Sequence, residues 1–95
     1  MPRTLLIDDI REIKADKVAR NYWEGIKALT EEIWDLVLLD HDLGCFDLDG
    51  YELTGYHVLC WLEMHPEFLP KKIILVTSNP VGRQRMQQVL RKLYS

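Results

Sequence analysis

The sequence predicts an α/β domain of three layers, built on a mostly parallel sheet of about four strands with three helices. Two observations support this fold class. Short apolar runs alternate along the chain with longer segments whose apolar residues recur at helical spacing. Two of these runs also stop abruptly at acidic residues, a pattern typical of buried parallel strands whose carboxyl ends open on a polar site.

The first half of the chain predicts strands at 4–8, 17–20 and 36–39, with a helix over 22–32. Asn21 is a good N-cap for this helix. Its inward face is predicted to hold four apolar residues: Tyr22, Ile26, Leu29 and Ile33. Only about eight residues join the first two strands, whereas a parallel crossover usually takes a dozen or more. Either the second strand is vestigial or the link is an extended coil without a helix.

The second half predicts a long loop over 40–53, a helix that begins after Thr54, a strand at 73–77 and a final helix. Ser78 or Asn79 is expected to cap the final helix, with Pro80 in its first turn. The two helices have predicted buried stripes, made of Gly55, Val58, Leu59 and Leu62 in one and of Met86, Val89, Leu90 and Leu93 in the other.

Length and composition indicate one globular domain over 1–95, with 47% hydrophobic and 28% charged residues. The net charge of −3 gives no basis for a broad nucleic-acid surface. The chain shows no signal-peptide pattern at its start and no apolar stretch of membrane-spanning length, so we expect a cytoplasmic protein without a membrane partner.

Acidic residues follow two of the predicted strands. Asp8 and Asp9 end the first apolar run, and Asp40 and Asp42 follow the run at 36–39. If these strands are neighbours, the carboxylates meet at the carboxyl edge of the sheet, where open α/β sheets bind ligands. We expect Asp8, Asp9 and Asp40 to hold a hard cation such as Mg²⁺ or Mn²⁺. The alternative is that single acids cap loops or pair with basic side chains.

Polar residues at a third strand end complement the acids. Thr77, Ser78 and Asn79 precede the last helix, where amides, hydroxyls and the helix dipole can hold a phosphate group. Simple helix capping is the alternative. The expected catalytic residues are Asp40, His41 and Asp42, with His41 or Asp42 as the proton carrier. Strand alternation would point His41 away from both neighbouring acids, which leaves a structural role open.

Three segments resemble signatures of the receiver domain of two-component response regulators: Leu6-Ile7-Asp8-Asp9, the run from Asp35 to Asp40, and Ile74-Leu75-Val76-Thr77. The resemblance implies a flavodoxin-like fold and Mg²⁺ on Asp8 and Asp9. It places Asp40 at the phosphoacceptor position and Thr77 in contact with the phosphoryl group.

The chain is more similar to the cyclic-phosphate-processing receivers. Asp40-His41-Asp42-Leu43-Gly44, Thr54-Gly55-Tyr56 and a Ser78-Asn79-Pro80 turn followed by Gly82 and Met86 carry this similarity. Members of that family usually have His where this chain has Thr77. Compared with an ordinary receiver, the chain is expected to be truncated: it lacks the first helix, the fifth strand and helix, and the lysine that neutralises a phosphoryl group. Stable phosphorylation of Asp40 by a histidine kinase is therefore not expected.

Three functions remain open. One is a metal-dependent site that processes or recognises a phosphate, including a cyclic one, on a nucleotide or RNA end. In its enzymatic form this would be a phosphohydrolase or phosphodiesterase. The second is a non-enzymatic module that binds a protein partner, because an incomplete sheet leaves an open edge. The third is a regulator that responds to phosphorylation, which would require a phosphate mimic such as beryllofluoride to bind at Asp40.

Overall fold

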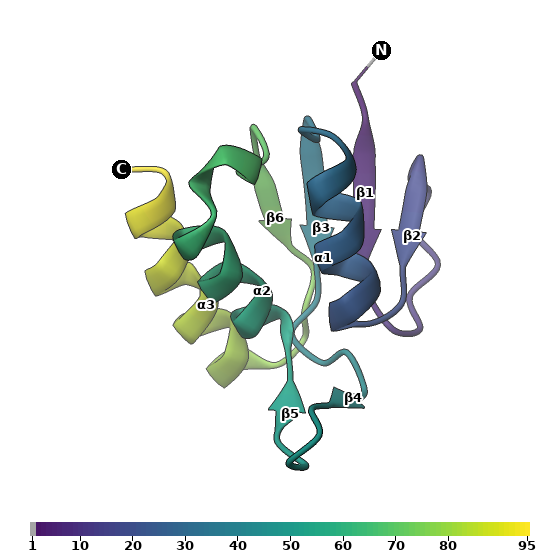
Figure 1. Ribbon diagram of the computed structural model, residues 1–95, viewed down its shortest axis with the longest axis vertical. Coiled ribbons are helices and arrows are strands. Elements are labelled where there is room, and N and C mark those ends of the chain that lie inside the picture. The colour runs from purple at the N-terminus through teal and green to yellow at the C-terminus, as the bar shows by residue number, and fades with distance from the viewer. Residues whose placement is uncertain (1) are drawn as a thin grey trace.

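The computed structural model describes residues 2–95 and has one four-stranded parallel sheet (Figure 1). Its strands lie in the order β2-β1-β3-β6 and comprise β1 (Thr4–Ile7), β2 (Lys17–Ala19), β3 (Leu36–Leu39) and β6 (Ile73–Leu75). A short antiparallel hairpin, β4 (Cys45–Phe46) with β5 (Glu52–Leu53), occupies the segment for which the sequence predicted only a loop. The predicted α/β class and the parallel sheet are confirmed.

Three α-helices follow the strands, and each begins at a capping residue. They are α1 (Tyr22–Glu31), α2 (Gly55–Met64) and α3 (Pro80–Leu93), and a 3₁₀ turn follows α2 at Pro66–Phe68. Asn21 accepts the amide of Glu24, and Thr54 accepts that of Tyr56. Of the two caps expected for the last helix, Asn79 is the residue that accepts the amide of Gly82. Among residues 2–95, no helix is both long and apolar enough to cross a membrane.

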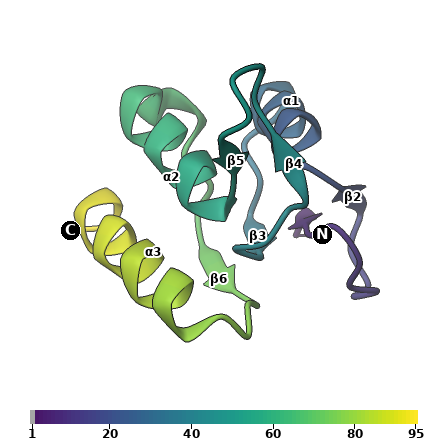
Figure 2. The same cartoon turned by 90° about the horizontal axis from the view of Figure 1, so that it is seen from below.

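The helices lie on one face of the sheet (Figures 1 and 2). Both helical crossovers step in the same direction, from β2 to β3 and from β3 to β6, so right-handed connections put α1 and α2 on the same side. The step from β1 to β2 runs the opposite way, and the segment at 8–16 therefore crosses the other face (Figure 2). The sequence predicted three layers. The layer on this second face of the sheet is formed by a coil and not by helices (Figure 2).

The coil between β1 and β2 resolves the alternatives that the short link left open. β2 pairs with β1 in parallel register, with Leu6 opposite Val18. At the far end of the coil, the amide of Asp16 donates to the carbonyl of Thr4 at 2.9 Å. The Asp16 carboxylate in turn accepts the Thr4 amide at 2.7 Å. The second strand is therefore formed, and an extended coil suffices to reach it.

The core lies between the sheet and its helices. Its strand residues include Leu5, Ile7, Val37 and Leu39. Trp34 is buried in the same core, with its indole N–H donating to the carbonyl of Ala28. The stripe predicted for α2 is buried as expected. The face predicted for α1 is partly wrong: Ile33 lies beyond the end of the helix and is 48% exposed. The fully buried residues of α1 are Gly25, Ala28 and Leu29, because small side chains let the helix approach Ile7.

Helix α2 starts in direct contact with the end of β3. The amide of Gly55 donates to the carbonyl of His41 at 2.8 Å. A Cβ atom at Gly55 would lie 2.0 Å from the backbone oxygen of Asp40. Only glycine allows this approach, and the approach fixes the backbone that carries Asp40 and His41.

We expect Gly55→Ala to lower the free energy of unfolding by about 2–3 kcal/mol, because the added methyl group meets backbone that cannot rotate away. Urea unfolding at neutral pH measures this change. Gln88→Ala on the exposed side of α3 is the control, and it should stay within about 0.5 kcal/mol of the wild type. An equally small effect at Gly55 would contradict the close approach.

Candidate functional site

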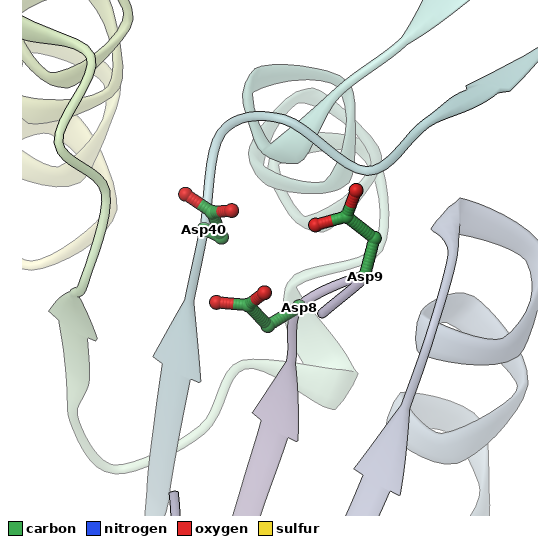
Figure 3. A group of neighbouring side chains, drawn as sticks. All are labelled: Asp8, Asp9 and Asp40. Carbon is green, nitrogen blue, oxygen red and sulfur yellow. The ribbon is translucent and has the colours of Figure 1, made fainter. Parts of the chain in front are cut away.

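Three carboxylates meet at the carboxyl edge of the sheet (Figure 3). Ile7 pairs with Leu39 across β1 and β3, so Asp8 and Asp40, the next residues of the two strands, emerge side by side. One carboxylate oxygen from each of Asp8, Asp9 and Asp40 lies within 4.8 Å of the others. Asp8 and Asp40 are buried and Asp9 is half-buried. The structure therefore groups the residues that the sequence predicted as metal ligands.

Backbone amides orient the two buried carboxylates. Oδ1 of Asp8 accepts the amides of Ile10 at 3.1 Å and Arg11 at 2.9 Å, which turns the chain sharply after β1. Oδ1 of Asp40 accepts the amide of His41 at 2.8 Å. At Asp8 these two bonds leave Oδ2 to face other groups. The cluster is thus pre-organised by local hydrogen bonds.

Burial raises the pKa of Asp40 above its usual value, and the nearby Asp8 carboxylate raises it further. A side-chain hydrogen bond with Thr77, the amide of His41 and the charge of Arg11 act in the opposite direction but do not outweigh these effects. The fold therefore disfavours the ionised form of Asp40 when no added cation is present. A divalent cation between the carboxylates would reverse this balance.

The donor set fits a hard cation. Mg²⁺ prefers carboxylate oxygens, retains several waters and often shares its site with a phosphate. A cavity of about 320 Å³ opens beside the carboxylates and leaves room for waters or a ligand. Its lining residues are Asp8, Asp9, Ile10, Arg11, Asp40, Asp42 and Ser78.

His41 does not line this cavity. Its Nδ1 lies 3.0 Å from Oδ1 of Asp42 and 3.4 Å from the side-chain nitrogen of Asn79. Its ring packs on Gly82 in the first turn of α3, where a Cβ atom would lie 2.4 Å from a ring carbon. Asp42 is 56% exposed and does line the cavity. Asp42 is therefore the candidate proton carrier with access to the cavity, and His41 orients it.

The three residues predicted to bind phosphate have different surroundings. Thr77 is buried, and its hydroxyl accepts the amide of Asn79 at 3.0 Å. The side-chain oxygen of Asn79 is occupied as the cap of α3. Ser78 is exposed and lines the cavity. Of the three, Ser78 is the side chain placed to meet a ligand beside the carboxylates.

Arg11 also lies at the site, although the sequence did not single it out. Its Nη1 lies 3.1 Å from Oδ2 of Asp8 and 3.8 Å from Oδ1 of Asp40, and it also donates to the carbonyl of Val76. The sequence carried one usable signal, a basic residue three positions after an acid at a strand end. That signal depends on a tight turn after β1, which neither periodicity nor glycine content indicates.

We expect Asp40→Asn to stabilise the metal-free protein at neutral pH. Because the folded pKa of Asp40 lies above its unfolded value, the unfolded chain ionises first as the pH rises. The stability that protonated Asp40 contributes is therefore present below the unfolded pKa and lost as the pH rises through the folded pKa. Urea midpoints measured with chelator at a series of pH values, from below the ordinary pKa of an aspartate up to neutral pH, should show an advantage of the variant that grows with pH. A constant or negative difference would contradict the raised pKa.

Comparison with known families adds one finding. The family model described as "Cyclic-phosphate processing Receiver domain" matches residues 3–92. The match takes in every strand of the sheet, the three carboxylates and nearly all of α3. No curated protein and no solved structure matched the chain. The chain belongs to the cyclic-phosphate processing receiver domain family.

Proposed function

We propose that this domain binds a divalent cation, Mg²⁺ or Mn²⁺, together with a phosphate group of a nucleotide or RNA end. The observation that carries the proposal is the group of three carboxylates, whose oxygens lie within 4.8 Å of one another beside an open cavity. Such a group repels itself unless a cation or protons compensate its charge. The cation would keep open coordination positions, which a phosphate oxygen can fill.

Each residue has a role in this proposal. Oδ2 of Asp8 and the carboxylates of Asp9 and Asp40 are the metal ligands. The hydroxyl of Ser78 donates to a phosphate oxygen, next to the amino-terminal end of α3. Thr77 and Asn79 do not contact the phosphate in this proposal. Their hydrogen bonds hold the turn that places Ser78 at the cavity.

A cyclic phosphate is the ligand class that the family description favours. The cavity, at about 320 Å³, lies at the small end of the range for ligand sites and suits a phosphate with its sugar. A bound divalent cation would polarise a phosphoryl oxygen and activate water. Asp42, oriented by His41, is then the group that takes up or returns a proton at the cavity.

A second candidate function is the binding of a protein partner without catalysis. The observation that favours it is the outer edge of β6, which no strand pairs among residues 2–95. Beside this edge lies a cavity of about 410 Å³ with Lys71, Lys72 and Arg91 among its lining residues. An acidic extended segment would fit such an edge. Asp40→Asn should leave partner binding at this edge unchanged, which separates the two functions.

Metal binding is the first test of the proposal. Wild-type protein should bind Mn²⁺ in isothermal titration calorimetry, and Asp40→Asn should weaken the affinity at least about tenfold, because a ligand oxygen and its charge are lost. Asp49→Asn makes the same charge change in the exposed loop between β4 and β5 and should bind like the wild type. Equal binding by all three proteins, or none by the wild type, would sink the proposal.

Turnover separates an enzyme from a binding site. With 2′,3′-cyclic nucleotides and Mg²⁺, the enzymatic form should open the cyclic phosphate, as followed by phosphorus NMR. Asp42→Asn should slow this reaction about 10²- to 10⁴-fold, the usual contribution of a positioned proton carrier, while Mn²⁺ affinity changes little. Metal binding without turnover would assign the domain to recognition.

A further inference from the structure

We propose that Arg11 is the built-in cation of the acidic cluster, that it gives up this position to a divalent cation, and that it then becomes the phosphate-binding group of the same site. This inference rests on the proposed function. Arg11 would pair with the Asp8 carboxylate when no metal is bound, and with a phosphate when metal and phosphate are both bound.

Arg11 occupies the position expected of a bound cation. One nitrogen, Nη1, is surrounded by Oδ2 of Asp8, Oδ1 of Asp40 and the carbonyl oxygen of Val76. These acceptors come from the ends of β1, β3 and β6, three strands that meet only in the folded sheet. A guanidinium is always charged, so the contact compensates buried acids at any working pH. Asp8 is fully buried, which makes this compensation necessary.

Arg11 and a metal ion need the same oxygen atom. Oδ1 of Asp8 already accepts two backbone amides. Oδ2 is the remaining oxygen, and Arg11 lies 3.1 Å from it. A divalent cation bound to Asp8 and Asp40 would be within contact distance of Nη1, and two positive groups at that separation repel strongly. Metal binding therefore requires the guanidinium to leave.

The side chain can leave while its backbone stays. The amide of Arg11 is held by Asp8 and its carbonyl accepts from Arg20 at 2.9 Å, so the main chain is fixed at both sides of the residue. The side chain is partly exposed and lines the cavity together with Ser78. A change of rotamer keeps the guanidinium at the cavity, where a phosphate on the metal is the nearest new negative charge. The guanidinium fork matches two phosphate oxygens.

This exchange couples the two ligands. Metal alone must break the contacts of Arg11 without replacing them, so its affinity is lowered. With phosphate present, the released guanidinium regains an anionic partner and metal binds more tightly. The coupling is reciprocal, since each ligand raises the affinity for the other by the same factor.

The experiment titrates Mg²⁺ into the protein and follows backbone nitrogen–proton NMR shifts of Asp9 and Gly44, with and without inorganic phosphate. Phosphate should raise the Mg²⁺ affinity of the wild type about fivefold or more. Arg11→Gln should bind Mg²⁺ alone about tenfold more tightly than the wild type and lose most of the response to phosphate. Arg3→Gln removes an arginine that pairs with Glu32 at the other end of the sheet, and it should behave as the wild type.

Arg11→Gln could fail to fold because it leaves the buried Asp8 carboxylate without its positive partner, so a second variant is needed. Arg11→Lys keeps a positive charge for Asp8 but lacks the fork, so it should fold, bind Mg²⁺ alone about as weakly as the wild type and lose most of the phosphate response. If Arg11→Gln binds Mg²⁺ no more tightly than the wild type, or if either variant keeps the full phosphate response, the inference is wrong while the metal site stands. If the wild type does not bind Mg²⁺ at all, the proposed function fails and the inference fails with it.

Discussion

The parallel pairing of β1 with β3 is the constraint on which the site depends. Register fixes Ile7 opposite Leu39, and the next residue of each strand is an aspartate. Burial of both strands leaves these carboxylates no freedom to separate, because the leucines and isoleucine before them are packed in the core. A shift of register by one residue would move Asp8 and Asp40 out of line with each other and break up the cluster.

Burial of the carboxylates creates an electrostatic problem that the fold solves only in part. Asp8 is compensated by two amides and by Arg11, whereas Asp40 retains a raised pKa. A site that is incompletely compensated without metal gains most when a cation enters it. The coil that replaces a helix between β1 and β2 has a direct part in this, since it brings Arg11 back over the strand ends. The departure from a helical third layer therefore places a basic side chain beside the acidic cluster.

Two glycines set the distances between the helices and the site. Gly55 lets the start of α2 touch the backbone of Asp40, and Gly82 lets the ring of His41 lie on the first turn of α3. Both contacts need the absence of a Cβ atom. In the segment after β3, Asp40 belongs to the carboxylate cluster. His41 packs against α3 and contacts Asp42, whose side chain lines the cavity.

The sequence by itself determined the class of the fold, the sheet strands, the three helices and the three clustered acids, because apolar periodicity and acidic strand ends are local patterns that burial imposes on a chain. It also indicated the family, through the segments around Asp40, Thr54 and Ser78. Only the tertiary structure decided that the helices share one face, that Ile33 lies outside α1, and that β4 and β5 form a hairpin within the loop. It alone placed Arg11 within the cluster and the ring of His41 on the first turn of α3, although strand alternation had already pointed His41 away from the acids. These features depend on which strand ends become neighbours and on how a short coil returns across the sheet. They are contacts between residues far apart in the chain, and local patterns such as apolar periodicity do not report such contacts.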